Sequence, residues 1–438
     1  MYTDRIARAN TVKQFGKVTQ VVGLVIESAG PAISIGRLCN IENHDGSSKM
    51  QAEVVGFRDN RLLLMPYAPI GGINPGAIVT STADQLRVPV GPHLIGRILG
   101  GLGQPIDGKG PVASSITRPI SAPPIPVLQR RRITEPVRTG IKAIDAMTAV
   151  GKGQRMGIFA GSGVGKSVML GMIARNSSAD VNVIALVGER GREVREFIER
   201  DLGPKGLARS VVVAVSSDQP ALIRIKGAMV ATAIAEYFRD EGKNVMLLMD
   251  SVTRVAMAQR EIGLAVGEPP ATKGYTPSVF TLLPSLLERA GSNDKGSITG
   301  LYTVLVEADD FNEPISDAVR SILDGHVALS RKLASLNQYP AVDVLDSISR
   351  LMKDVSTPEE IELAGKVREI VATYREAEDL INIGAYVKGS NPRIDRAISK
   401  IERINELFRQ GIDEQCGHEE TVARMKDLLT EEVNAEEV

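Results

Sequence analysis

The chain has 438 residues, of which 43% are hydrophobic and 24% charged, enough for two or three globular domains with large buried cores. Its 52 Lys and Arg residues balance 53 Asp and Glu residues, which argues against broad nucleic-acid binding, since that usually shows as a basic excess. Cys39 and Cys416 lack metal-type spacing, and no apolar run approaches the roughly 18 residues of a membrane span or forms a signal-peptide core. We therefore expect a cytoplasmic protein with reduced thiols, which could still associate with a membrane complex through its surface.

The N-terminal part of the chain divides into two segments. Residues 1–17 carry four basic side chains and one acid, a composition that predicts a flexible arm, either solvated or ordered when it meets a partner. Residues 18–86 contain short β-rich runs cut by Gly, Pro, Asn and Asp, with no helical period. Strands at such close spacing predict a small closed β-barrel domain.

The middle of the chain, residues 87–355, changes from a Gly- and Pro-rich opening to an alternating pattern. The opening predicts a strand pair and an extended connection that ends near Arg130, Arg131 and Arg132, which are either solvated surface or an anion site. Beyond Thr139, nearly continuous apolar runs alternate with helical patterns, as strands buried on both faces require. This alternation predicts a doubly wound, mostly parallel α/β domain.

The end of the chain, residues 356–438, loses the strand pattern. Residues 357–360 form a capping box with Pro at the first helical position, and the Asn-Pro pair 391–392 begins another helix. Apolar residues recur on one face of each helix: Ile361, Ala364, Val367, Val371 and Tyr374 in the first, and Ile394, Ile398, Ile401 and Ile404 in the second. We expect a C-terminal helical bundle with an acidic tail.

The most specific motif lies in residues 157–167, GIFAGSGVGKS. An apolar run precedes it and a helix-compatible run follows, which is the strand–loop–helix context of a phosphate loop, although a chance Gly-rich turn is the alternative. Its glycines allow backbone N–H groups to wrap a polyphosphate, Lys166 would reach the β- and γ-phosphates, and the Ser167 hydroxyl would bind Mg²⁺. We expect ATP to be bound by Ala160, Gly161, Ser162, Gly163, Val164, Gly165, Lys166 and Ser167.

Hydrolysis also requires a metal ligand and a group that orients the attacking water, and two carboxylates are candidates. Asp250 ends the apolar run 245–249, where a Walker B carboxylate would hold Mg²⁺; its alternative role is the N-cap of the next helix. Glu189 follows another apolar run and could polarise the water, unless it pairs with Arg190 or Arg192. A site without Glu189 would bind nucleotide without turnover.

Together these residues resemble the hexameric rotary ATPase family, whose best-known member is the catalytic subunit of ATP synthase. The blocks that carry the resemblance are AGSGVGKS, GERGREV, LLMDSVTR, GEPPATKGY and YPAVDVLDSISR. The family implies a RecA-like P-loop core between an N-terminal β-barrel and a C-terminal helical domain. The block ADDFNEPISDAVRSILDGHVALSR resembles the type III secretion ATPases, and LINIGAYVKGSNP is more similar to the flagellar export ATPase than to the injectisome one.

The resemblance implies a role for each matching residue. These roles are phosphate and Mg²⁺ contacts for Lys166 and Ser167, the Walker B carboxylate for Asp250, the catalytic carboxylate for Glu189, a γ-phosphate contact for Arg190, an arginine finger entering the neighbouring subunit for Arg350, and the adenine pocket for Tyr339 and Tyr386. From its own sequence context, Tyr339 could equally be a core residue. Ala160 departs from the usual Gly at the first loop position and is small enough to keep the turn if its φ is negative.

An arginine finger that acts in trans implies an assembly. One chain type carries both the site and the finger, so a ring of identical copies, six by the resemblance, would complete each site. The flagellar branch implies further partners: an export stator or regulator, a central stalk, chaperone–substrate complexes and the export gate of the inner membrane, with which the protein would associate peripherally. We expect no nucleic-acid partner.

The expected function is ATP hydrolysis for flagellar protein export, and four alternatives remain open. An injectisome ATPase shares the branch, and a rotary ATP synthase catalytic subunit shares the site but needs unlike non-catalytic partners. An RNA-translocating hexameric helicase would need aromatic stacking platforms, and residues 18–86 offer Phe57 and Tyr67 as their only aromatics. A non-hydrolysing nucleotide-binding subunit is disfavoured by Glu189.

Overall fold

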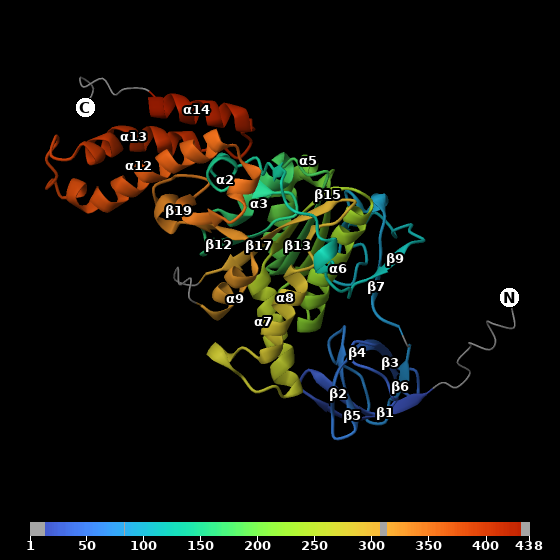
Figure 1. Cartoon of the computed structure of the whole chain (residues 1–438). Helices are drawn as coiled ribbons and strands as arrows, with labels where there is room; N and C mark the ends of the chain where they lie inside the picture. Colours follow the sequence, from blue (N-terminus) through green and yellow to red (C-terminus); the bar gives the residue numbers. More distant parts are fainter. Residues whose placement is uncertain (1–13, 83, 307–312, 431–438) are drawn as a thin grey trace.

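The computed structural model describes residues 14–82, 84–306 and 313–430. Figure 1 shows three parts in a row: an N-terminal barrel, a central α/β domain, and C-terminal helices at the opposite end from the barrel. The predicted three-part architecture is therefore confirmed. The predicted arm up to residue 13 and the acidic tail from residue 431 lie outside the described residues.

The N-terminal part is a closed antiparallel barrel with the strand order β1-β2-β5-β4-β3-β6. Its strands are β1 (Phe15–Val22), β2 (Val25–Ala29), β3 (Leu38–Glu42), β4 (Lys49–Arg58), β5 (Arg61–Pro66) and β6 (Ile78–Ser81). Ile26, Ile41 and Leu64 are fully buried inside it. Residues 15–17, which the sequence assigned to the arm, belong to the barrel, because their backbone pairs with β6 and closes the sheet.

A buried ion pair joins the barrel to the central domain. Lys226 lies on α6 (Ala221–Asp240), and its Nζ is 2.7 Å from the carboxylate of Glu53 on β4. The hydroxyl of Tyr67 donates a hydrogen bond to the same carboxylate at 2.5 Å. All three residues are buried, and burial of both charges is tolerated because each is paired.

The segment between barrel and core forms the predicted strand pair and connection. Strand β7 (Arg87–Pro89) pairs with β9 (Thr117–Pro119), and the intervening β8 (Ile98–Leu99) joins the edge of the main sheet. The short elements around them are η1 (Pro92–Leu94), η2 (Val127–Gln129), β10 (Pro136–Val137), α2 (Lys142–Met147) and β11 (Val150–Gly151).

Two of the three adjacent arginines of this segment, Arg130 and Arg132, form ion pairs with residues of the central domain. Arg130 donates to the backbone oxygen of Ala290 at 3.1 Å and pairs with Glu288 at 3.0 Å. Arg132 pairs with Asp354 at 3.0 Å. The extended connection is thus fixed to the core by its side chains.

The central sheet has the order β19-β18-β12-β17-β15-β13-β14-β8. Its strands are β12 (Arg155–Ala160), β13 (Val181–Glu189), β14 (Ser210–Ser216), β15 (Asn244–Asp250), β17 (Ser297–Leu305), β18 (Gly325–Leu329) and β19 (Val342–Ser349), with β16 (Gly291–Ser292) beside β17. Pairing is parallel except for β19 and β16, so the carboxyl ends of the parallel strands meet at one edge.

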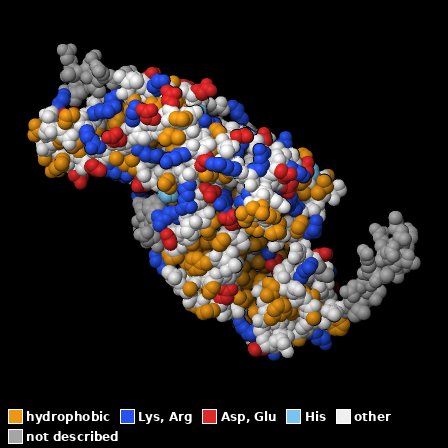
Figure 2. Space-filling model, viewed as in Figure 1, with side chains coloured by type: hydrophobic (Ala, Val, Ile, Leu, Met, Phe, Trp, Pro, Cys, Tyr) orange, Lys and Arg blue, Asp and Glu red, His pale blue; other side chains and the backbone are white. Residues whose placement is uncertain are grey.

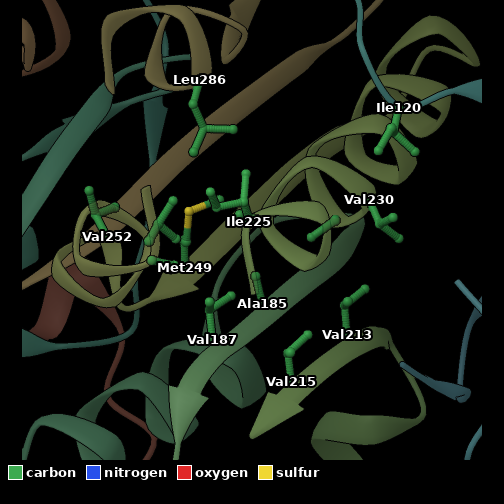
Figure 3. Packing of buried hydrophobic residues seen from close by; sticks show 14 of the residues in the cluster. Ile120, Ala185, Val187, Val213, Val215, Ile225, Val230, Met249, Val252 and Leu286 are labelled. Carbon is green, nitrogen blue, oxygen red and sulfur yellow. The ribbon is translucent and has the colours of Figure 1, made fainter. Parts of the chain in front are cut away.

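Apolar residues of the strands alternate between two cores, which explains their continuous hydrophobic runs. On β13, Ala185 and Val187 face the core that contains α6, whereas Ile184 and Leu186 face the core on the other side of the sheet, with α3 (Lys166–Asn176). Figure 3 shows the first of these cores, where side chains of β13, β14 and β15 meet α6.

The remaining helices cover the sheet and form the C-terminal part. Around the sheet lie α4 (Gly191–Glu196), the π-helix η3 (Phe197–Leu202), α5 (Gly203–Leu207), α7 (Val252–Val266), η4 (Thr272–Gly274), α8 (Pro277–Leu287), α9 (Pro314–Ile322), α10 (Arg331–Ser335) and α11 (Met352–Val355). The C-terminal helices are α12 (Pro358–Asn382), α13 (Pro392–Phe408) and α14 (His418–Thr430). The predicted capping box of α12 and the Asn391 cap of α13 are both present.

The surface has mixed charge. Figure 2 shows basic and acidic side chains interspersed over the visible face, as the balanced composition predicts. Within the described ranges, no helix has both the length and the apolar character that crossing a membrane requires.

Candidate active site

The phosphate loop lies at the carboxyl edge of the sheet, between β12 and α3. Strand β12 pairs with β17 on one side and β18 on the other, so the loop leaves from the middle of the sheet. Gly163 and Gly165 have φ of 80° and 86°, a region that favours glycine, and α3 begins directly afterwards at Lys166. Ala160 is the last residue of β12 and is buried, so its methyl group sits within the strand and leaves the loop glycines their conformational freedom.

A cleft of about 600 Å³ opens beside this loop. Its walls combine the loop with charged side chains from three directions: β13 and α4, the π-helix, and α7 with α10. The charged lining residues among those described are Lys166, Glu189, Arg190, Glu193, Arg200, Asp201, Arg254 and Arg331. An excess of basic side chains around a glycine-rich loop suits a polyphosphate.

Asp250 is held directly beside the loop lysine. It ends β15, is 2% exposed, and its Oδ1 accepts hydrogen bonds from Lys166 Nζ and, at 2.7 Å, from Thr303 Oγ1. The alternative role as a helix N-cap belongs to the next residue, Ser251, whose hydroxyl accepts from Arg254 N. The carboxylate of Asp250 is therefore free of a capping role and faces the cleft lysine.

Glu189, the last residue of β13, also lies beside Lys166, with 3.7 Å between its Oε1 and Lys166 Nζ. Arg190 and Arg192, its alternative partners, pair instead with Glu193 and Glu196. Within the described part of the chain, its buried Oε1 has no hydrogen-bond partner. Burial and the neighbouring negative charge of Asp250 raise the pKa of Glu189 to about 7, against the opposing effect of Lys166.

This raised pKa predicts the pH dependence of the reaction. A general base must be ionised, and a carboxyl with a pKa of about 7 is ionised above that pH and protonated below it. We expect kcat/KM for ATP to fall as pH decreases through 7, reaching about one tenth of its plateau one pH unit lower. Steady-state rates at constant ionic strength measure this. Binding of ATP to the Glu189→Gln variant over the same pH range is the control, because it reports the effect of the ionisation of ATP itself. A flat profile would contradict the assignment.

The two tyrosines expected at the adenine differ in position. Tyr339 is 39% exposed, and its ring lies 3.3 Å from where a Cβ on Gly165 would be, so it packs beside the phosphate loop. Tyr386 lies in the turn between α12 and α13, and its hydroxyl donates to Asp395 Oδ1 at 2.9 Å. Neither tyrosine is among the described residues that line the cleft. The structure places Tyr339 beside the loop, and the adenine role of Tyr386 stays a prediction.

Arg350 is exposed and lies at the opposite edge of the sheet. Its N–H donates to Asp324 O, and Asp324 N–H donates in turn to Arg155 O, so Arg350 is level with the first residue of β12. The phosphate loop follows the last residue of that strand, Ala160, five steps of about 3.3 Å further along. The backbone of Arg350 therefore lies near the end of β12 that is opposite the nucleotide cleft of its own protomer.

Arg254, Arg200 and Arg331 line the cleft but were not predicted from the sequence. Arg254 packs its aliphatic stem on Gly188, where a Cβ would come within 2.9 Å, and its buried Nε has no hydrogen-bond partner in the described ranges. Its position on the first turn of α7, directly after the strand that ends at Asp250, is the signal that could have found it, because this turn begins at the edge of the sheet that carries the phosphate loop.

Comparison with known proteins fits this geometry. A model of the nucleotide-binding domain of the ATP synthase alpha/beta family matches residues 140–349, and the beta-barrel domain of the same family matches residues 18–83. The chain belongs to the ATP synthase alpha/beta family. Residues 356–427 match the T3SS EscN ATPase C-terminal domain, which places the chain in the secretion branch of the family, as its sequence blocks predicted.

Relatives within the family cover nearly the whole chain. The flagellum-specific ATP synthase of Bacillus subtilis (strain 168) is 57% identical over 431 residues, 98% of each chain. Among solved structures, the assembled ATPase EscN of the enteropathogenic E. coli type III secretion system is similar with a TM-score of 0.89 at 43% identity, covering 94% of this chain and 100% of that one. EscN in complex with its central stalk EscO gives a TM-score of 0.87 with the same identity and coverage.

Proposed function

We propose that this protein is an ATP hydrolase that energises type III protein export for assembly of the bacterial flagellum. The observation that carries the proposal is the meeting of Lys166, Asp250 and Glu189 beside the phosphate loop, since these supply the charge, the metal-binding carboxylate and the base that hydrolysis requires. The identity of 57% to a flagellum-specific relative, against 50% to the type 3 secretion system ATPase of Xanthomonas euvesicatoria, favours the flagellum over an injectisome.

The site residues fit a nucleotide with Mg²⁺. The Ser167 hydroxyl and the Asp250 carboxylate are oxygen ligands of the kind Mg²⁺ prefers. No cluster of three or more His, Cys, Asp or Glu in the described ranges could hold a metal, so phosphate oxygens and water would supply the remaining ligands. When bound, Mg²⁺ would neutralise part of the phosphate charge.

Each side chain then has a chemical task. The loop N–H groups and Lys166 hold the β- and γ-phosphates of ATP. Glu189 accepts a proton from the water that attacks the γ-phosphorus, and the bond to ADP breaks on the opposite side. Arg190 is largely exposed, and its Nη1 lies 3.4 Å from Glu193 Oε1. It lines the cleft and contacts the γ-phosphate. Tyr339 stacks on the adenine.

Arg350 supports an assembly of identical copies. It is exposed at the edge opposite its own cleft, as an arginine that completes a neighbour's site must be. Closed cyclic symmetry allows each copy to give one arginine and receive one. The structure of assembled EscN supports an assembly, and six is the number that the resemblance to the rotary ATPases implies. We therefore propose a homohexameric ring.

The remaining partners are proposed from the branch. A central stalk is supported by the complex of EscN with EscO. A flagellar export stator or regulator, chaperone–substrate complexes and the membrane export gate complete the set, with the protein in the cytoplasm and peripherally associated with the inner membrane. Tyr386, at the α12–α13 turn, is the second residue proposed for the adenine pocket.

Loss of the gene tests the export function directly. We expect cells without flagellar filaments and without exported flagellar subunits in the medium, because the energy source for export is removed. Electron microscopy and analysis of the culture supernatant measure this, and restoration by the wild-type gene but not by a Glu189→Gln gene links the defect to hydrolysis. Normal flagella together with lost effector secretion would identify an injectisome ATPase, and lost oxidative ATP synthesis would identify a synthase subunit.

A further inference from the structure

The linker between α13 and α14, residues 409–417, contacts the residue proposed to bind adenine. The backbone N–H of Gln410 donates to Tyr339 O at 2.9 Å. The same residue is 4% exposed, and its side chain bonds at both ends to the start of α2: Oε1 accepts from Lys142 N at 3.0 Å, and Nε2 donates to Gly140 O at 2.9 Å. Gln410 thus links Tyr339 to the central domain and to the C-terminal helices at once.

Further contacts fix the linker in this position. Lys142 Nζ donates to Arg409 O at 3.2 Å and pairs with the Glu414 carboxylate. Arg175, on α3, donates from Nη2 to Ile412 O at 2.7 Å. Arg175 lies in the last turn of α3, so the linker is attached to the helix that follows the phosphate loop as well as to Tyr339.

We propose that Gln410 is a positioning residue for Tyr339, through which the location of the C-terminal helices sets the affinity for the adenine base. The inference rests on the proposed role of Tyr339 in base binding. Tyr339 is partly exposed and needs a fixed backbone to present its ring to a ligand, and the Gln410 N–H holds its carbonyl. A displacement of α13 therefore moves the tyrosine, and by linkage a bound base resists that displacement.

The test is a double-mutant cycle of Gln410→Ala and Tyr339→Ala in the full-length chain, read as KM and kcat for ATP hydrolysis and as the inhibition constant of inorganic tripolyphosphate. We expect Gln410→Ala to raise the KM for ATP about tenfold with little change in kcat, because buried partners of the amide are left unsatisfied and the ring is displaced. Tripolyphosphate has no base, so its inhibition constant should stay the same. In the Tyr339→Ala background, Gln410→Ala should change KM less than about twofold.

Gln415→Ala is the matched control, since this glutamine lies in the same linker and its side chain donates to the Asn176 side chain, at 3.4 Å. If Gln410→Ala raises KM equally with and without Tyr339, or weakens tripolyphosphate to the same extent, the positioning role is wrong. Should circular dichroism show Gln410→Ala to be unfolded, the cycle is run with Gln410→Glu, which keeps the volume and the Lys142 contact. Whether the wild-type protein hydrolyses ATP tests the proposed function separately and does not depend on the result of the double-mutant cycle.

Discussion

ATP hydrolysis by the Glu189→Gln variant is expected to fall on the order of 10²–10⁴-fold, while ATP binding stays close to the wild-type value. The amide has the size of the carboxylate but cannot accept a proton from water. Lys166 and the phosphate loop are unaffected, and removal of one negative charge also relieves the repulsion between Glu189 and Asp250 that contributes to the raised pKa of Glu189. Phosphate release measures turnover, and equilibrium titration with a fluorescent ATP analogue measures binding.

Glu196→Gln is the control for this variant. Glu196 lies on the adjacent helix α4 and pairs with Arg192 on the surface, at 2.7 Å. It should hydrolyse ATP like the wild type, so a loss common to both variants would point to a disturbed α4 and not to the base. Turnover that survives in Glu189→Gln would remove Glu189 from its catalytic role and leave the chain as a nucleotide-binding protein with another base.

Arg350→Ala is expected to lower turnover roughly 10³–10⁵-fold, the effect that an arginine finger has in comparable phosphoryl-transfer systems. Arg350 is exposed and its backbone is level with the start of β12, five residues before the end that carries the phosphate loop, so we expect the loss to act on a neighbouring copy. Folding should be unchanged, since the backbone contact to Asp324 does not involve the side chain. The matched control is Arg393→Ala, an exposed arginine on α13 paired with Glu369 at 3.3 Å.

Mixing two inactive variants distinguishes a neighbour's arginine from one that acts within its own chain. An Arg350→Ala copy keeps Glu189, and a Glu189→Gln copy keeps Arg350. A mixed ring therefore regains a complete site wherever a Glu189→Gln copy supplies its arginine to the site of an Arg350→Ala copy. At equal proportions about a quarter of the sites are restored. Wild-type specific activity should also rise with protein concentration as rings assemble. Mixtures without recovered activity, or activity strictly linear in concentration, would contradict the shared site.

The sequence predicted what depends on local pattern. The phosphate loop, Asp250 and Glu189 stand at strand ends, and the carboxyl ends of neighbouring parallel strands meet at one edge, so sequence alone could bring them together. Whether Tyr386 reaches the base could not be predicted in the same way, because that depends on how the α12–α13 turn is directed, which no local pattern encodes. Arg254 was missed for a related reason: a single arginine on a helix has many possible neighbours.

The C-terminal helices show a second limit. The isoleucines of α13 predicted its buried face, but the fully buried positions include Ala397, Lys400 and Ile404. Lys400 is buried with its Nζ bonded to Leu428 O on α14, so a polar residue occupies a core position that hydropathy assigns to solvent. Likewise, the first barrel strand begins before the sequence loses its arm-like composition, because pairing with β6 and not composition decides where a strand begins.

The Lys226–Glu53 pair determines which parts of the molecule can move relative to one another. Pulling the barrel off α6 would break this pair and the Tyr67 hydrogen bond to the same carboxylate, and would expose the apolar cluster that barrel residues such as Val25, Leu38 and Leu63 share with the central domain. The barrel and the sheet should consequently move as one rigid body, so that in a closed ring the barrels form a rigid layer. Conformational changes driven by ATP would then have to occur at the opposite end of the protein, in the helices that follow Val355.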